Sequence, residues 1–360
     1  MNFQKLSNEI LQGRRLSAAE ALELFNYGDI LAMGNLANTL RERRHGSKSY
    51  YIVNRHIDYS NICAIQCKFC AFARKKGEEG AFEFSIEQIV DRVKDGLKRG
   101  ITEIHMVGGF HPTHPWEFYT GVLEAVKKVA PNLHIKAFTA AEIRYFSKKF
   151  RMTQEEVLQK LMKAGLDSMP GGGAEIFDAE IRKEICGPKG PAEHWIETQK
   201  LAHSLGLKST ATMLYGHIEN FKHRVDHMDR IRNLQDETGG FMCFIPLAFN
   251  PKDTEYESRG YTSSVDDLKT LAISRIFFDN ISHIKAYWIM SGVDTAQMAQ
   301  HFGSDDFHGT VIEENITHMA GGLSPSDLPE NKIERLILDS GRIPVKRDSL
   351  YNELSGGPLQ

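Results

Sequence analysis

The segment "YYIVNRHIDYSNICAIQCKFCAF", residues 50–72, joins an apolar run to a loop that holds three of the chain's five cysteines. Residues 50–60 are rich in β-branched and aromatic side chains, which predicts a buried strand. Cys63, Cys67 and Cys70 follow at once, in the spacing C-x3-C-x2-C. Thiols crowded at the end of a strand predict a metal or cluster site at that strand's carboxyl end.

Seven further runs resemble this first strand, and helical stretches separate them. Capping pairs mark helix starts, such as Ser85 with Gln88, Thr153 with Glu156 and Ser263 with Asp266. Strand alternating with helix predicts an α/β fold, and eight strands predict a (β/α)8 TIM-type barrel. The later strands are expected at residues 103–109, 134–140, 167–173, 208–216, 240–249, 283–290 and 307–312.

The ends of the chain lie outside these eight units. "SAAE" at residues 17–20 is a capping box that opens an apolar-periodic stretch through Leu40, with Gly46 just beyond its end. We therefore expect an N-terminal helical extension at residues 1–49, the barrel at 50–312, and a C-terminal extension at 313–360 that packs on the barrel.

Composition and charge limit the binding partners and the cellular compartment that we expect for the protein. The 360 residues carry 44 Lys and Arg against 47 Asp and Glu, a net charge of −3 that predicts no nucleic-acid partner. No apolar stretch approaches the ~20 residues that span a bilayer, and no secretory signal is present, so a cytoplasmic protein without a membrane partner is expected. Thiols stay reduced there, which argues against a structural disulfide. Cys186 and Cys243 are interpreted as small buried hydrophobes.

Two kinds of site suit the three clustered cysteines. Structural zinc prefers four protein ligands that fill its coordination shell. His56 on the preceding strand does not complete the usual pair of CxxC or CxxH units. A [4Fe–4S] cluster held by three thiolates leaves one iron open to a substrate, which explains the missing fourth ligand. The sequence favours the cluster.

Two other metal sites are considered and not favoured: His223 with His227 in "HRVDH", and "HPTHP" at residues 111–115, which is better explained by turn chemistry.

A C-x3-C-x-aromatic-C motif that closes the first strand of a barrel resembles that of the radical S-adenosylmethionine (SAM) enzymes. The resemblance implies a [4Fe–4S] cluster on Cys63, Cys67 and Cys70, with SAM chelating the open iron and a low-potential electron donor of flavodoxin or ferredoxin type. "VGGFHP" and "PGGGAEIFDAEIR" resemble two cofactor-contacting segments of that family. They imply that Gly108, Gly109, Glu175 and Arg182 contact SAM, and Phe69 and Phe72 are expected to shield cluster and adenine.

The resemblance extends over the whole chain and narrows to one group. "HIDYSNIC", "SMPGGGAEI", "ATMLYGHIE", "RNLQDETGGFMCFIPLAFNP" and "VIEEN" are similar to the futalosine-pathway enzymes of menaquinone biosynthesis and their deazaflavin-forming relatives. Leu247 stands where a Trp is expected in the cyclising members, so the aminofutalosine-forming members are the better match.

That match implies a C–C bond-forming transferase of the alkyl- and aryl-transferring class (EC 2.5.1.-). The 5′-deoxyadenosyl radical from SAM would add to 3-[(1-carboxyvinyl)oxy]benzoate, with aryl migration and decarboxylation, giving 6-amino-6-deoxyfutalosine, and SAM would be consumed. Two carboxylates need cationic or amide partners, and His217, Arg74 and Arg144 are the candidates. The alternatives left open are a cyclic dehypoxanthinylfutalosine synthase, a deazaflavin-type synthase and a non-enzymatic zinc-stabilised binding module.

Overall fold

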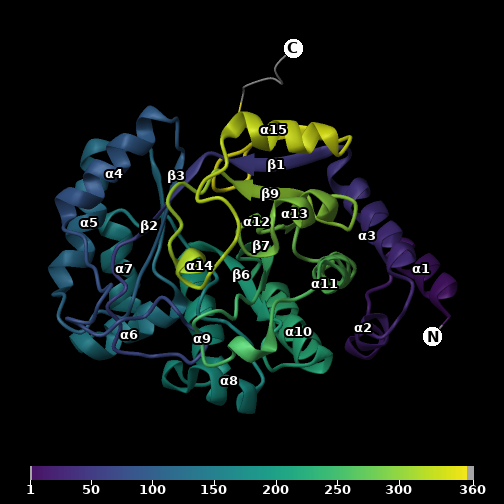
Figure 1. Cartoon of the computed structure of the whole chain (residues 1–360), viewed down its shortest axis with the longest axis horizontal. Helices are drawn as coiled ribbons and strands as arrows, with labels where there is room; N and C mark the ends of the chain where they lie inside the picture. Colours follow the sequence, from purple (N-terminus) through teal and green to yellow (C-terminus); the bar gives the residue numbers. More distant parts are fainter. Residues whose placement is uncertain (1, 355–360) are drawn as a thin grey trace.

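The computed structural model describes residues 2–354, and its centre is a seven-stranded parallel sheet that curls into a barrel (Figure 1). The strand order follows the chain, so each strand pairs with the next one along. This is the arrangement that βαβ units with right-handed crossovers produce. The strands are β2 (Asn54–Asp58), β3 (Glu103–Val107), β4 (His134–Ala137), β5 (Ser168–Met169), β6 (Lys208–Tyr215), β7 (Phe241–Ala248) and β8 (His283–Ile284).

An eighth segment lies between the two edges of this sheet. β9 (Asp306–Gly309) forms a parallel bridge from Asp306 to Lys285 beyond β8, and Ile312 forms another to Arg55 of β2. His308 and Val311 have φ of 76° and 47°, outside the extended region, so this segment makes isolated bridges instead of a continuous ladder. The predicted α/β barrel is confirmed, with seven strands in one ladder and the eighth joined by bridges.

The expected first strand, residues 50–60, is two strands in two sheets. β1 (Lys48–Ile52) pairs in parallel with β10 (Ile343–Lys346) and β9 in a separate three-stranded sheet, and the barrel begins only at β2. The C-terminal extension therefore adds a strand next to the first strand of the chain. The domain boundaries at 49/50 and 312/313 stay a prediction.

Most of the helices cover the outside of the barrel. In the described residues the helices are α1 (Phe3–Leu11), α2 (Ala18–Phe25), α3 (Ile30–His45), α4 (Ile86–Lys98), α5 (Trp116–Val129), α6 (Ala140–Phe150), α7 (Gln154–Ala164), α8 (Ala179–Cys186), α9 (Ala192–Ser204), α10 (Phe221–Thr238), α11 (Ser264–Phe277), α12 (Trp288–Ser291), α13 (Val293–Ala299), α14 (Ile316–Met319) and α15 (Glu330–Asp339), with 3-10 turns at η1 (Gly187–Lys189) and η2 (Glu257–Arg259). Of these, α14 lies instead at a cavity, which its residues Ile316 and Thr317 line (Figure 1).

The predicted helix starts are confirmed. Ser17, Ser85 and Thr153 each form a capping box, and the Ser263 side chain accepts from the Asp266 N–H. The stretch from Ser17 to Leu40 is broken, however, because Asp29 caps a new helix after a turn at residues 26–29. No helix of residues 2–354 is long and apolar enough to cross a membrane.

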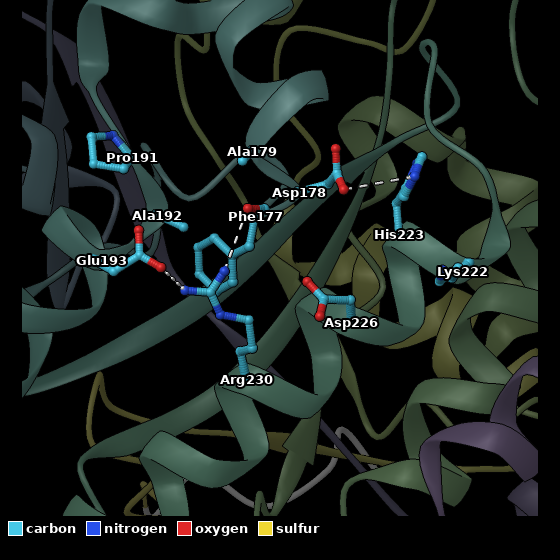
Figure 2. Close-up of a pocket in the computed structure, with 10 residues that line it drawn as sticks. All are labelled: Phe177, Asp178, Ala179, Pro191, Ala192, Glu193, Lys222, His223, Asp226 and Arg230. Carbon is cyan, nitrogen blue, oxygen red and sulfur yellow. Dashed lines mark hydrogen bonds and ion pairs between the residues drawn. The ribbon is translucent and has the colours of Figure 1, made fainter.

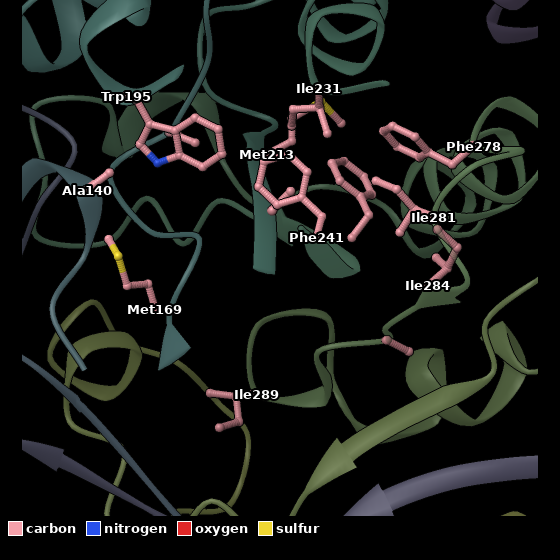
Figure 3. Close-up of a cluster of buried hydrophobic side chains, with 14 of the residues drawn as sticks. Ala140, Met169, Trp195, Met213, Ile231, Phe241, Phe278, Ile281, Ile284 and Ile289 are labelled. Atoms are coloured by element: carbon pink, nitrogen blue, oxygen red, sulfur yellow. The ribbon is translucent and has the colours of Figure 1, made fainter. Parts of the chain in front are cut away.

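The apolar core fills the space between the barrel and its helices (Figure 3). Trp195 of α9 stacks on Phe241 of β7 with ring centroids 5.8 Å apart, and Met213 and Ile231 beside them are fully buried. Rings and aliphatic chains of this size dominate burial energetics. They fix the strands rigidly, so the loops at the carboxyl ends of the strands start from a stable rim.

Candidate active site

The cysteine loop is closed at its base by backbone hydrogen bonds. The Cys63 N–H donates to the Arg74 carbonyl at 2.9 Å, and the Arg74 N–H donates to the Asn61 carbonyl at 2.9 Å. The loop is also tied to the loop after β3, because the Ala64 N–H donates to the Phe110 carbonyl at 2.9 Å and the Phe110 N–H approaches Cys63 Sγ at 3.4 Å. The loops that follow β2 and β3 are therefore joined by hydrogen bonds into one structure.

All three cysteines of the motif line one cavity of about 290 Å³ at the carboxyl ends of the strands. None forms a disulfide. Burial raises the pKa of Cys67 to about 12 and raises the pKa of Cys63 as well. Buried thiols of this kind become thiolates when a cation such as iron compensates the charge.

The three sulfurs of the motif are not gathered as tightly as the ligands of a single zinc ion. Sulfurs about 2.3 Å from a tetrahedral zinc lie about 3.8 Å from one another. Among residues 2–354, two groups of three or more His, Cys, Asp or Glu side chains have all donor atoms within 4.8 Å of each other, and neither contains a cysteine. At least one pair of the three sulfurs therefore lies more than 4.8 Å apart, farther than two thiolates on one zinc ion.

The two glycines after β3 lie where side chains would collide. A Cβ on Gly109 would be 2.4 Å from the Ile62 carbonyl oxygen, and one on Gly108 would be 2.6 Å from the Tyr59 ring. Both glycines line the cavity. Their small size lets the β3 loop press against the start of the cysteine loop, and the Gly109 N–H donates to the Ser60 carbonyl at 2.7 Å.

The segment after β5 forms the opposite wall. Residues 170–173 and Glu175 line the cavity, and Glu175 accepts a hydrogen bond from Lys189 Nζ at 2.5 Å. Lys189 also lines the cavity, with its Nζ 5.2 Å from the centre of the Phe69 ring. The sequence analysis missed Lys189. Its signal was weak, because one lysine in the turn "CGPKGP" looks like an ordinary solvated residue.

Arg182 supports this wall from behind. Its guanidinium donates to the carbonyls of Gly173, Ala174 and Gly190 at 3.0, 2.5 and 2.7 Å, and it is 2% exposed. It is not among the residues that line the cavity. Its contact with a cofactor stays a prediction, whereas its hold on the loop of Glu175 is visible in the structure.

The predicted aromatic shields lie at the cavity, and the three predicted substrate contacts do not. Phe69 and Phe72 line it. His217 is bound through Nε2 to the Leu214 carbonyl at 3.1 Å and through Nδ1 to the Ile218 N–H at 2.8 Å. Arg74 donates to the Ala71 and Ala73 carbonyls, and Arg144 contacts His194 Nε2 at 2.8 Å. Each of these three side chains hydrogen-bonds to other protein groups, and none of them is among the residues that line the cavity.

Other basic side chains take their place deeper in the barrel. His56, His105 and Lys136 stand opposite one another in the registers of β2, β3 and β4, and all three line the cavity together with Lys285 and His308. From the sequence, His56 was weighed only as a zinc ligand, and the other four residues were not predicted. Buried strands of a parallel barrel are apolar on both faces, so no alternation marks the inward positions.

The histidines of the two metal sites that the sequence did not favour contact other protein groups, and His111 and His114 with Glu83 form one of the two groups of described residues whose donor atoms lie within 4.8 Å of one another. His223 lies in a surface hollow with Asp178, whose carboxylate is 3.8 Å away (Figure 2). His227 contacts the Thr212 carbonyl at 2.8 Å and is fully buried. His111 and His114 approach Glu83 at 3.0 and 3.4 Å. His111 Nδ1 accepts two backbone N–H groups, so its Nε2 carries the proton and faces Glu83 as a donor.

A parallel α/β barrel with three cysteines at the carboxyl end of its first strand defines an iron–sulfur radical enzyme of the SAM-cleaving class. The sequence matches the family model of the Radical SAM superfamily over residues 57–231 and that of the CofH/MqnC C-terminal region over residues 238–356. The chain belongs to the radical SAM superfamily. Accordingly it uses a [4Fe–4S] cluster and SAM, and Cys63, Cys67 and Cys70 are the residues that fit the cluster.

Two relatives are similar over almost the full length. The chain is 46% identical over 353 residues to an aminodeoxyfutalosine synthase of Thermus thermophilus, which covers 97% of this chain and 95% of that protein. It is 41% identical over 362 residues to an aminodeoxyfutalosine synthase of Streptomyces coelicolor, with 98% and 94% covered. The crystal structure of methylornithine synthase superposes with a TM-score of 0.76 at 16% identity, covering 94% of this chain and 97% of that one, which shows the shared fold.

Proposed function

We propose that this chain is an aminofutalosine synthase. It joins the adenosyl part of SAM to 3-[(1-carboxyvinyl)oxy]benzoate, with aryl migration and loss of carbon dioxide, and releases 6-amino-6-deoxyfutalosine for menaquinone biosynthesis. The names of the two full-length relatives support this reaction. The observation that carries it in the structure is one continuous cavity that has the three cysteines at its rim and buried cations in its depth.

The cofactors supply the radical, and the protein positions the reactants. The reduced cluster and SAM together provide the 5′-deoxyadenosyl radical. We assign the cluster to Cys63, Cys67 and Cys70, and the SAM-facing wall to Gly108, Gly109, Glu175, Phe69 and Phe72. We assign Lys189 to the same wall as the partner of Glu175, and Arg182 to the loop behind it. A low-potential flavodoxin or ferredoxin in the cytoplasm would supply the electron.

The cavity wall also bears on the two related activities. Leu247, the position where the sequence led us to expect Trp in the cyclising enzymes, lines the cavity beside Ile245. Leucine leaves room there for the aryl ring of the substrate. This feature favours the aminofutalosine-forming reaction over the cyclising one, and it supports the EC 2.5.1.- transferase assignment.

The product assay tests the proposal. Anaerobically reconstituted, dithionite-reduced protein is incubated with SAM and 3-[(1-carboxyvinyl)oxy]benzoate, and products are separated by liquid chromatography with mass detection. Aminofutalosine in proportion to SAM consumed is expected. Free 5′-deoxyadenosine as the sole nucleoside product, in the presence of saturating substrate, would contradict the proposal and favour hydrogen-abstraction chemistry. Stoichiometric zinc without sulfide would point instead to the binding module.

A further inference from the structure

The deep part of the cavity is lined by five basic side chains from five separate segments of the chain. They are His56, His105, Lys136, Lys285 and His308. Four of them are at most 5% exposed, and Lys285 and His308 are 2% and 3% exposed. Basic groups at this depth need a specific reason, because burial of unpaired polar groups costs stability.

Several nitrogens of this layer have no partner within residues 2–354. They are Nε2 of His56, Nδ1 of His105 and both ring nitrogens of His308. Burial lowers the pKa of His56 to about 4 and holds the pKa values of His105 and His308 well below the usual range. The rings are therefore neutral at pH 7, and each carries one N–H that can be donated to a ligand.

The layer also carries one positive charge in excess. Lys136 Nζ is paired with Glu103 at 2.8 Å, and Arg347 is paired with Asp306 at 2.7 Å. The ammonium of Lys285 makes no hydrogen bond to the described residues, and its ion pair with Asp306 is long, at 3.8 Å. Asp306 already accepts from Arg347 and from the Tyr351 hydroxyl.

The nearby acids do not supply the missing negative charge. Glu314 accepts from the Thr317 backbone N–H and side chain, and it lies 3.2 Å from His318 Nδ1, whose pKa it raises to about 9. Burial, together with the neighbouring Glu314 carboxylate, raises the pKa of Asp58, which disfavours a second negative charge there. An anionic ligand completes the layer both in charge and in hydrogen bonds.

Apolar residues separate this layer from the cysteines. Val107 follows His105 along β3 towards the carboxyl end, and Leu214, Ile245 and Leu247 lie in the carboxyl-terminal halves of β6 and β7; all four line the cavity. A fitting ligand therefore has an apolar body and a carboxylate at its far end. In the proposed reaction the vinyl carbon must face the adenosyl group near the cysteines, so the ring carboxylate is the part of the substrate that reaches the deep layer.

We propose that Lys285, together with the N–H groups of His308 and His56, binds the ring carboxylate of the substrate. This inference rests on the proposed function, and it names the part of the site that selects a benzoate over an uncharged aryl group. Lys285 acts as the cation, and the histidines act as neutral hydrogen-bond donors. Because these groups are buried, water competes little for their hydrogen bonds.

The kinetic test compares two substrates with two proteins. The full substrate and 2-phenoxyprop-2-enoate, which lacks the ring carboxylate, are each given to the native enzyme and to Lys285→Met. The KM of the variant for the full substrate is expected to rise roughly 10- to 100-fold, and its KM for the phenoxy compound to stay as in the native enzyme. Lys285→Arg keeps the charge and should restore much of the difference. Lys128→Met, on the exposed face of α5, is the matched control.

A binding test separates this inference from the proposed function. Benzoate should raise the melting temperature of the reconstituted native protein, benzamide should not, and both Lys285→Met and His308→Asn should abolish the benzoate effect. His308→Asn tolerates the positive φ of this position. Variants are compared at equal iron and sulfide content.

The two tests have separate outcomes. If the native protein forms no aminofutalosine but binds benzoate through Lys285, the proposed function is wrong and the anion site stands. If product forms but Lys285→Met affects both substrates equally, or benzoate binding survives both substitutions, the anion site is wrong.

Discussion

Lys189 Nζ lies 2.5 Å from Oε1 of Glu175, and both side chains line the cavity that holds the three cysteines. The side chains of Lys189 and Glu175 are 12% and 9% exposed, so the pair is largely removed from water. Glu175 adopts a positive φ of 48°, and the Arg182 guanidinium donates to the carbonyls of Gly173 and Ala174 in the same loop. One buried ion pair therefore joins the segment after β5 to the turn that carries Lys189.

Lys189→Met should destabilise the protein, because it leaves the Glu175 carboxylate buried without its partner. Loss of one partner of a buried pair costs about 3 kcal/mol or more. Lys68→Met is the matched control, since Lys68 forms an exposed pair with Glu184 at 2.7 Å on the same side of the barrel, and such pairs contribute about 1 kcal/mol or less. Urea denaturation of the two variants measures the difference. Equal losses would show that the Lys189 pair is not buried in solution.

Replacement of each cluster cysteine by alanine should abolish iron binding, whereas replacement of the two remaining cysteines should not. Cys243 lies buried on β7 and does not line the cavity, and neither does Cys186. Iron and sulfide analysis after anaerobic reconstitution, with the absorbance near 400 nm, measures the outcome. Full cluster content in Cys67→Ala, or its loss in Cys243→Ala with the fold intact, would contradict the assignment.

Gly109→Ala should disturb the cluster loop, because the new Cβ would meet the Ile62 carbonyl oxygen at 2.4 Å. Overpacking of this kind costs roughly 1–3 kcal/mol and shifts the backbone. We expect weaker SAM binding and lower cluster content. Gly28→Ala is the control, since a Cβ there meets nothing within 4 Å and its φ is not positive. Equilibrium binding of SAM to both variants gives the comparison, and equal affinities would refute the close packing.

The stability of the protein should fall between about pH 6.5 and pH 9 through His318. Glu314 raises the pKa of this histidine to about 9 in the folded state, above its ordinary value of 6.5. Its contribution is therefore fully present below pH 6.5 and is lost as the pH rises through the folded pKa. The free energy of unfolding of the native protein minus that of His318→Gln should decline over this range. A difference that stays constant from pH 6 to pH 9 would exclude the pair.

Local features of the chain were predictable because neighbouring residues determine them. The cysteine spacing, the capping boxes at Ser85 and Thr153 and the alternation of strand and helix all follow from short-range chemistry. The split of residues 50–60 into β1 and β2 was not predictable. It depends on β10, nearly 300 residues away, which pairs with β1 and not with the barrel.

The sequence alone determined the fold class and the kind of chemistry, and it led to the assignment of the cluster to Cys63, Cys67 and Cys70 that we propose, since each depends on patterns in the chain itself. The tertiary structure decided which cations line the cavity. His217, Arg74 and Arg144 follow strands, but their hydrogen bonds hold them away from the cavity. Lys136, Lys285 and His308 come from three distant strand segments, and only barrel closure brings their side chains into one buried layer. Inward and outward positions on such strands are both buried, so the sequence carries no sign of which side chains converge.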